Sequence, residues 1–438
     1  MTIESLVINF PYTQHSVLVF FKKNRNLYNA IRGITKQHGF VTTTEGTTEI
    51  EERNIKKGGC KMQRNIVVRN GHVIDPANQI DGIRDVYISN GRIVAESDMQ
   101  NIDLEFNADG KYVFPGLIDY HAHVFPNSTE IGIDPDSTLL CQGVTSVVDP
   151  GSAGVSNIET FIKDVANRAI MRVEAYINLC PSGMPTMKFH EDFNPKHWDK
   201  EKLRQALAKY PDLLQGLKIR ISKPIMGDLP FSVFEQAEAL AKELDTRLCV
   251  HVTNPQKNMA EVVSVLQKGD ILAHCYHGTG YSILDENGNV LDAVKEAQKR
   301  GVIMDAANGG NHWNFEVAEK ALADGFLPDI ISTDLTSKTI FKDPVFGLPY
   351  IMSKYLMLGM SISDIVKRCT ENPGNLMNGK EKPGTLSKGA LADVAVFSLE
   401  DHVVTFSDTS GAKRTGNKLF RPVLTLCKGE IVYRDMTF

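Results

Sequence analysis

Short apolar runs alternate with amphipathic stretches along the middle of the chain. Eight runs with the composition of buried strands are Leu117–Tyr120, Val144–Asp149, Arg172–Leu179, Gly216–Ile221, Leu248–Val252, Ile271–Ala273, Val302–Asp305 and Ile330–Thr333. The stretches between most of them place apolar residues at helical spacing, as in Lys202–Lys209, Val233–Leu244, Met259–Leu266, Val290–Lys299 and Phe315–Ala323. Eight strand–helix units over roughly 260 residues predict an α/β fold, a (β/α)8 TIM-type barrel. The alternative is an open doubly wound sheet, but no G-x-G-x-x-G motif follows any of the runs.

The segments on both sides of this region have a different pattern, of short strands separated by tight turns. The N-terminal runs are Asn65–Val68, His72–Ile74 and Asp85–Ile88, with Asn-Gly and Asp-Gly pairs between them. The same pattern returns near the C-terminus in Asp393–Phe397, Val403–Phe406, Val423–Leu426 and Ile431–Tyr433. We therefore expect residues 62–113 and 378–438 to form the two halves of a small β-sandwich beside a barrel of residues 114–377.

Residues 1–61 show no helical or strand periodicity of useful length. No basic region precedes the apolar run Ser16–Phe21 and no small-residue cleavage site follows it, so a signal peptide is not indicated. Lys57-Gly58-Gly59 stands just before Met62, and its codons can spell a purine-rich bacterial ribosome-binding site. We expect Met62 to be the true start and residues 1–61 to be a non-native or disordered extension. The alternative is a real, loosely ordered extension.

The composition is that of an ordinary globular protein. Hydrophobic residues make up 42% and charged residues 23%, and the net charge of −5 gives no electrostatic footprint for nucleic acid or an anionic membrane. The apolar runs are far shorter than the roughly 18 residues of a membrane span. The seven cysteines form no C-x-x-C pair and are typical of reduced thiols in a cytoplasmic protein. We expect a small-molecule substrate, no nucleic-acid or membrane partner, and a homo-oligomer.

Side chains that can bind a metal ion stand at the ends of the predicted strands. In a barrel, residues at the carboxyl ends of the strands form the active site. Residues at i and i+2 of an extended segment point the same way, so two histidines at this spacing can reach one ion. The first and fourth predicted strands carry pairs at this spacing, His121 with His123 and Lys218 with Arg220. Three further strands end in one polar residue each, His251, His274 and Asp334.

Each of these residues alone has an ordinary structural interpretation, but together they indicate a metal site. Neutral imidazole and carboxylate groups without a thiolate suit an ion such as Zn²⁺. A lysine in a barrel strand is a base, an anion binder or a lysine modified to become a metal ligand. The six candidate ligands exceed what one catalytic ion with an open position can use, which indicates two metal ions.

This constellation resembles that of the amidohydrolase superfamily and is most similar to its dihydroorotase-like amidohydrolase/deacetylase branch. The motifs that carry the resemblance are Phe114-Pro115-Gly116-Leu117-Ile118-Asp119 before His121-x-His123, Asp149-Pro150-Gly151-Ser152-Ala153-Gly154, and Pro383-Gly384-Thr385-Leu386. The resemblance implies that Lys218 carries a CO2-derived carbamate and bridges two divalent ions, usually zinc. By the same resemblance, His121, His123 and Asp334 hold one ion, and His251 and His274 hold the other.

The predicted function is that of a binuclear metal-dependent hydrolase. It would be a deacetylase or deacylase that cleaves an amide or ester bond of a small acylated acid, by attack of a metal-bridging hydroxide, with Asp334 as the catalytic proton acceptor. Phe125 stands where dihydroorotases carry a carboxylate-binding arginine, which disfavours that activity. The alternatives are a cyclic amide hydrolase of dihydroorotase or hydantoinase type and a purine deaminase. A non-catalytic scaffold is disfavoured because all six ligand positions are filled.

Four further residues are candidates for binding substrate. Arg220 shares the mouth-facing side of its strand with Lys218, and its planar fork suits a carboxylate. A structural salt bridge is the equal alternative for Arg220. His277, Asn308 and His312 follow other strands and could contact substrate from loops.

Overall fold

The computed structural model describes residues 3–9, 16–22, 41–43 and 64–438, which belong to two units, residues 1–62 and 63–438. In the first unit, β1 (Ile3–Asn9) pairs antiparallel with β2 (Ser16–Lys22) and β3 (Val41–Thr43). The sequence indicated no strands here. β1 and β2 are rich in apolar and β-branched residues without strict alternation, which is why a periodicity argument misses them. Whether this extension is native stays a prediction.

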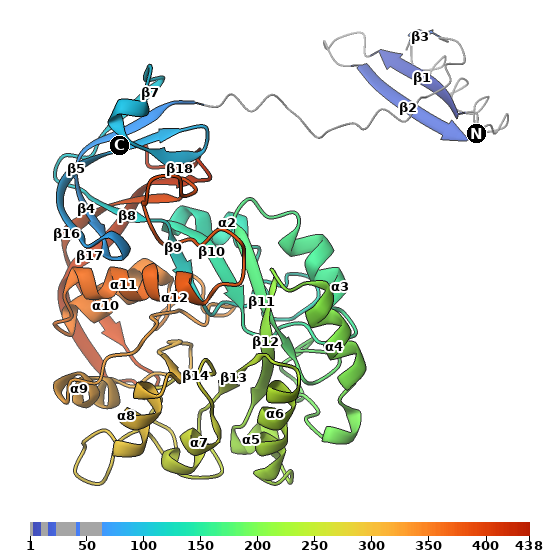
Figure 1. The fold of residues 1–438 in the computed structure, drawn as a ribbon, viewed down its shortest axis with the longest axis vertical. Helices are drawn as coiled ribbons and strands as arrows, with labels where there is room; N and C mark the ends of the chain where they lie inside the picture. The colour runs from blue at the N-terminus through green and yellow to red at the C-terminus, as the bar shows by residue number, and fades with distance from the viewer. Residues whose placement is uncertain (1–2, 10–15, 23–40, 44–63) are drawn as a thin grey trace. The chain divides into compact units, whose positions relative to one another are not determined.

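The second unit contains a parallel sheet of seven strands that follow one another in chain order (Figure 1). They are β9 (Leu117–Asp119), β10 (Val144–Asp149), β11 (Arg172–Asn178), β12 (Leu214–Arg220), β13 (Arg247–His251), β14 (Ile271–Ala273) and β15 (Ile303–Asp305). Nearly every residue in these strands is buried, because a parallel sheet of this kind is covered on both faces. Seven of the eight predicted strands are confirmed to within two residues at either end.

The predicted eighth strand is not a regular strand. Its segment is joined to the two outer strands of the sheet by single parallel bridges, Asp305 to Ile330 and Ala122 to Leu335. The regular extended conformation is interrupted at Asp334, whose φ of 51° lies in the left-handed region. The segment therefore lies between β15 and β9 and brings Asp334 beside the end of β9.

Amphipathic helices lie on the outside of the parallel sheet (Figure 1). The longer ones are α4 (Lys200–Lys209), α6 (Ser232–Glu243), α7 (Met259–Val265), α8 (Asp292–Lys299), α9 (Phe315–Ala323), α10 (Leu348–Met357) and α11 (Ile362–Cys369). The short ones are α2 (Pro135–Leu139), α3 (Ile158–Phe161), α5 (Lys223–Met226) and α12 (Glu371–Leu376). Four of the longer helices begin after a residue whose side chain accepts a backbone N–H of the first turn: Asp199, Asn258, Asn314 and Ser361.

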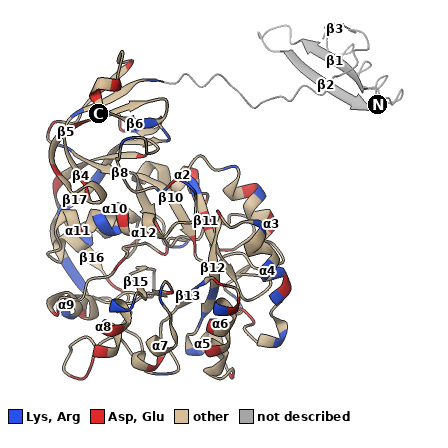
Figure 2. Cartoon of the chain, viewed as in Figure 1, with Lys and Arg blue, Asp and Glu red and all other residues tan. Residues whose placement is uncertain are grey.

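Charged residues gather on these outer helices and on the loops, whereas the main hydrophobic core lies between the helices and the sheet (Figure 2). A helix long and apolar enough to cross a membrane is not found among the residues that the structure describes.

The N- and C-terminal segments join in one mixed sheet of eight strands. Its order is β18-β17-β16-β8-β4-β5-β6, with β7 paired to β4. The N-terminal strands are β4 (Ile66–Asp75), β5 (Ile80–Ser89), β6 (Arg92–Val94), β7 (Leu104–Asn107) and β8 (Tyr112–Pro115). The C-terminal strands are β16 (Val394–Ser407), β17 (Lys413–Cys427) and β18 (Glu430–Arg434). Antiparallel pairing of β8 with β16 joins the two segments, so they form one continuous mixed sheet where two halves of a β-sandwich were expected.

Candidate metal centre

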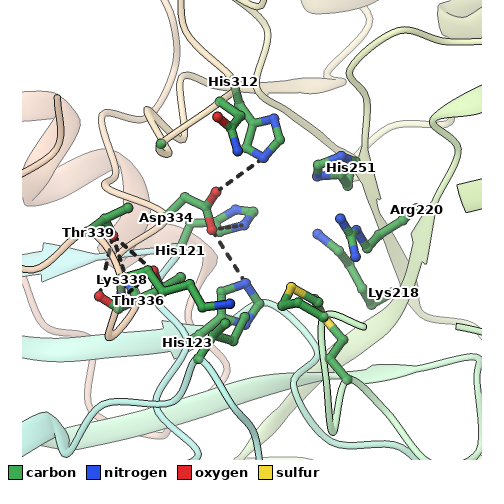
Figure 3. A pocket seen from close by; sticks show the side chains of 15 residues that line it. His121, His123, Lys218, Arg220, His251, His312, Asp334, Thr336, Lys338 and Thr339 are labelled. Carbon is green, nitrogen blue, oxygen red and sulfur yellow. Dashed lines mark hydrogen bonds and ion pairs between the residues drawn. The ribbon is translucent and has the colours of Figure 1, made fainter. Parts of the chain in front are cut away.

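A cavity of about 270 Å³ opens at the carboxyl ends of the parallel strands (Figure 3). Five of the six predicted metal ligands line it: His121, His123, Lys218, His251 and Asp334. The sixth, His274, is fully buried, and its ring nitrogen lies against that of His251. The structure therefore brings all six residues together, from strand ends that are far apart in the sequence.

The two histidines after β9 present the same ring nitrogen to Asp334. The Oδ1 atom of Asp334 lies 3.8 Å from His121 Nε2 and 3.4 Å from His123 Nε2. The other ring nitrogens are already engaged, with His121 Nδ1 3.2 Å from Asp305 Oδ2 and His123 Nδ1 2.7 Å from Ser152 Oγ. Such second partners hold an imidazole in one orientation, so both Nε2 atoms are fixed toward the cavity.

His251 and His274 face each other closely enough to share one ion. His251 Nδ1 and His274 Nε2 are 2.8 Å apart, and both side chains are buried. His274 Nδ1 lies 2.7 Å from the carbonyl oxygen of Ala307, to which it can only donate, so the lone pair of His274 is on Nε2. Burial lowers the pKa of both imidazoles well below the usual value, which keeps them neutral and able to bind a cation.

Lys218 lies on β12 beneath these groups and is 2% exposed. Among the described residues, the hydrogen-bond partner of its amine is the Cys249 sulfur, a weak acceptor at 3.6 Å. A buried ammonium without a carboxylate partner is costly, so this amine is suited to a chemistry that removes its charge. The stem of Lys218 passes close to Gly151, which has a φ of +100°, and a Cβ there would lie 2.6 Å from Lys218 Cβ.

The Asp334 carboxylate is held in its anionic form. Burial by itself would raise its pKa, but the hydrogen bond with His123 and the electrostatic interaction with the other imidazoles around it outweigh burial and lower the pKa below its usual range. Asp334 and His274 both adopt positive φ angles, 51° and 66°, which are rare for residues with a side chain. Strain of this kind gathers at functional sites, where the surrounding structure enforces it.

The donor atoms form two groups that fit divalent metal ions. One group comprises His121, His274 and Asp334, and the other comprises His251, His274 and His312, with the donor atoms of each group within 4.8 Å of one another. Imidazole nitrogens and a carboxylate oxygen are the ligands that Zn²⁺ and similar ions prefer. The residues present therefore fit a metal centre, but the grouping differs from the expected one. His274 belongs to both groups and His123 to neither, and His312 belongs to the second although the sequence indicated only a substrate contact.

Two of the predicted substrate-binding residues line the cavity. Arg220 does so, but its guanidinium is paired with both carboxylate oxygens of Glu191, at 3.1 and 3.3 Å. Glu191 is 8% exposed and comes from the loop after β11, where the sequence gives no periodic signal. His312 also lines the cavity, and its Nδ1 lies 3.0 Å from Thr253 Oγ1. Burial lowers the pKa of the His312 imidazole to about 4, so it is neutral near pH 7.

The other two predicted residues, His277 and Asn308, are buried outside the lining of the cavity. Their side-chain nitrogen and oxygen atoms have no hydrogen-bond partner within the part of the chain that the structure describes. Phe125 also lies outside the lining: it is 1% exposed and packs edge-to-face on Phe161 at 5.2 Å. The position that binds a carboxylate in dihydroorotases thus belongs to the hydrophobic core here.

The rest of the cavity wall comes from loop residues that the sequence did not single out. The loop after β11 contributes Met184 and Met187, and the loop after Asp334 contributes Thr336, Lys338 and Thr339. The segments after β9 and β15 add Ile131, Gly310 and Asn311. The one available signal was position, because residues that closely follow the end of a barrel strand are placed to reach the site.

Several known proteins are similar to this chain. Residues 112–432 match the model of the Amidohydrolase family. A deacetylase of Enterococcus faecalis is 29% identical over 373 residues, covering 84% of this chain and 99% of that protein. A deacetylase of Agrobacterium fabrum is 31% identical over 339 residues, covering 77% and 82%. The solved structures of an adenine deaminase and a dihydroorotase each give a TM-score of 0.77, with 28% and 29% identity, covering 85% of this chain and 100% and 98% of theirs.

Proposed function

Because the chain belongs to the amidohydrolase family and is a hydrolase of carbon–nitrogen bonds, we propose that it is a binuclear metal-dependent deacylase of small acylated acids. The observation that carries the proposal is the convergence of four histidines, Lys218 and Asp334 on one cavity. As part of the same proposal, residues 330–335 close the parallel strands into an eight-stranded barrel, since they bridge β15 and β9.

The proposed metal centre uses all six ligands. His121, His123 and Asp334 would hold one divalent ion, His251 and His274 the other, and a carbamate on Lys218 would bridge the two. A carbamate removes the buried positive charge, whose partner among the described residues is the Cys249 sulfur. When bound, such ions lower the pKa of water toward neutrality and polarise a carbonyl group.

Within this centre, Asp334 would move the proton. Its carboxylate is anionic because its pKa is lowered, and it faces the cavity between His123 and His312. It can therefore accept a proton from the attacking water at a carboxylate oxygen and pass it to the leaving amine. His312, neutral near pH 7, lies 3.9 Å from the other oxygen of Asp334 and limits where that carboxylate can turn.

The relatives and one position in the core support the proposed substrate class. The deacetylases match this chain at 29% and 31% identity over most of their length. With Phe125 packed on Phe161, the chain lacks the cation that a dihydroorotase uses at that position. We therefore propose removal of an acyl group from an N-acyl or O-acyl acid, ahead of cyclic amide hydrolysis.

A substrate screen combined with metal analysis tests this proposal. The purified full chain, loaded with Zn²⁺, should contain about two metal equivalents and should release acetate from N-acetyl or O-acetyl acids. Lys218→Ala, purified in parallel, controls for contaminating hydrolases and should release none. Faster turnover of dihydroorotate, hydantoin or adenine than of every acylated acid would overturn the proposal, as would a wild-type chain that binds no metal.

A further inference from the structure

The cavity has a charged residue that the metal centre does not use. Three cationic side chains line it, Lys218, Arg220 and Lys338. Lys218 lies at the bottom among the metal-ligand candidates, and Arg220 is already paired with a buried carboxylate, Glu191, whose side chain is 3% exposed. Lys338 is different because it stands on a loop at the wall of the cavity, opposite Arg220 in Figure 3.

The ion pair of Lys338 with Glu130 is too weak to keep the Lys338 amine from binding another anion. Its amine lies 3.7 Å from Glu130 Oε1, and the two side chains are 55% and 40% exposed. Exposed pairs of this kind contribute little because water screens them. The other oxygen of Glu130, Oε2, accepts the backbone N–H of Met187 at 2.8 Å and the hydroxyl of Thr186 at 3.0 Å. Glu130 therefore serves mainly to tie down a loop, and the Lys338 amine is free to bind another anion.

The backbone that carries Lys338 is nevertheless firmly placed. Thr336 and Thr339 close a turn around it, with Thr339 Oγ1 accepting the Thr336 N–H at 3.0 Å. Ser337, which directly precedes Lys338, donates its backbone N–H to the carbonyl oxygen of Ile131 at 2.9 Å. The turn begins two residues after Asp334, so the Lys338 side chain starts at a fixed distance from the metal centre and only its own rotamers move.

Apolar side chains line the cavity beside this lysine. Ile131 follows Glu130 directly, and Met184 and Met187 belong to the loop that Glu130 holds. A ligand that bound its anionic group to Lys338 would place its neighbouring substituent against these three side chains. Flexible methionines suit an apolar group of variable shape.

We propose that Lys338 binds the carboxylate of the substrate and makes the enzyme selective for acylated acids that carry an apolar side chain. This inference rests on the proposed function for the position of the acyl group, which must reach the metal centre while the carboxylate is held at the wall. The ammonium of Lys338 would leave Glu130 and donate a charge-assisted hydrogen bond to the substrate carboxylate. Arg220 would then keep its structural pairing with Glu191.

The test compares one acid with its matched neutral analogue. The acid is N-acetylphenylalanine, and the analogue is N-(2-phenylethyl)acetamide, which keeps the acetyl and phenyl groups but lacks the carboxylate. For the Zn²⁺-loaded full chain, Lys338→Met should raise the KM of the acid about 10- to 100-fold, the scale of a hydrogen bond to a charged group. The calorimetric Kd of the acid, measured in chains that also carry Asp334→Asn to stop turnover, should rise by the same factor. The kcat for the acid and the Kd of the analogue should change less than about twofold.

Three further variants serve as controls. Lys342→Met removes an exposed lysine of the same segment that does not line the cavity, and it should leave every value unchanged. Lys338→Arg should restore most of the affinity for the acid. Arg220→Met leaves the buried Glu191 unpaired and should weaken acid and analogue alike.

The inference is overturned if Lys338→Met weakens both ligands equally or neither, or if Arg220→Met alone shows the acid-selective loss. It is also overturned if the wild-type chain binds the acid no more tightly than the analogue. These outcomes differ from a failure of the proposed function. In that case the wild-type chain would hydrolyse neither compound, while the calorimetric Kd values would still decide the role of Lys338.

Discussion

Replacing Gly151 by alanine should disturb the proposed metal centre although none of its proposed ligands is replaced. Gly151 follows β10 with a φ of +100°, and a Cβ at this position would lie 2.6 Å from Lys218 Cβ and 2.7 Å from Lys218 Cγ. Carbon atoms in contact normally lie about 3.5–4.0 Å apart, so one of the two chains must move by about 1 Å. The Lys218 stem is buried on β12 and has little room to do so.

Two costs add in the Gly151→Ala variant. A side chain in this backbone region costs about 1–3 kcal/mol, and overpacking in a dense interior costs about 1–3 kcal/mol. The free energy of unfolding should therefore fall by about 2–6 kcal/mol. Because the displaced atoms belong to Lys218, the metal content should also fall, and turnover should drop about 100-fold, the scale of a 1 Å misplacement in an active site.

Gly359→Ala separates the two costs. Gly359 has a similar φ of +91°, but nothing lies within 4 Å of the Cβ that would be added. Urea unfolding of the metal-free chains and metal content by mass spectrometry should show the backbone cost alone in Gly359→Ala, with full metal binding. Equal destabilisation and equal metal content in the two variants would refute the claim that Gly151 makes room for the Lys218 stem.

Three further expectations concern single groups. Lys218→Ala should lose both metal ions in elemental analysis, with partial recovery of activity in the presence of small carboxylic acids, and full metal content would exclude a bridging role. Asp334→Asn should keep most of the metal while kcat falls about 10²–10⁴-fold, the scale of lost acid–base help, and an unchanged kcat would place the proton acceptor elsewhere. Burial lowers the pKa of Lys354 from 10.5 to about 7. The unfolded chain therefore binds more protons between these pH values, and wild-type stability should rise from pH 7 to 9.5 by about 3 kcal/mol relative to Lys354→Met, as measured by urea midpoints.

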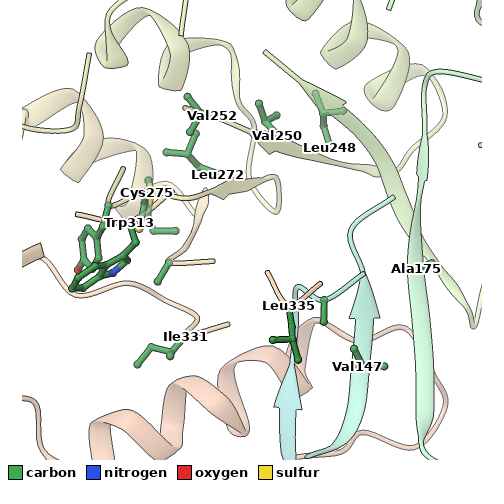
Figure 4. Close-up of a cluster of buried hydrophobic side chains, with 14 of the residues drawn as sticks. Val147, Ala175, Leu248, Val250, Val252, Leu272, Cys275, Trp313, Ile331 and Leu335 are labelled. Carbon is green, nitrogen blue, oxygen red and sulfur yellow. The ribbon is translucent and has the colours of Figure 1, made fainter. Parts of the chain in front are cut away.

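The strands of the parallel sheet could be predicted because their burial leaves a direct trace in the sequence. Leu248, Val250 and Val252 alternate along β13 and the residue after it, and they pack in the main core under the helices (Figure 4). Cys249 belongs to a separate inner cluster, and His251 lines the cavity. Alternation therefore indicated both the strand and the end at which polar groups gather.

The prediction of a regular eighth strand was wrong, for a reason that the apolar composition of the segment does not reveal. Its segment is as buried as the other strands, but it is joined to each neighbour by a single parallel bridge and not by a continuous ladder. The left-handed conformation of Asp334 is enforced by tertiary contacts, including donation of its backbone N–H to the carbonyl oxygen of His121 at 2.6 Å. Short-range sequence patterns do not contain such long-range constraints.

The residues of the candidate site also divide into those that the sequence could predict and those that it could not. Residues at strand ends could be found because strand position fixes their direction. Glu191 and Lys338 could not be found, because they lie on loops whose course depends on partners elsewhere in the chain, such as Arg220 and Glu130. The partner of a charged side chain decides whether it is available to a ligand, and a sequence does not show which partner a loop supplies.

Contacts within the chain hold His274 and Asp334 in their strained backbone conformations. His274 and Asp334 each hold a left-handed backbone conformation that costs about 1–3 kcal/mol and persists only where the surroundings enforce it. His274 is enforced by the hydrogen bond of its ring to Ala307, and Asp334 by the bond of its backbone to His121. Folding therefore supplies the energy that positions these two side chains.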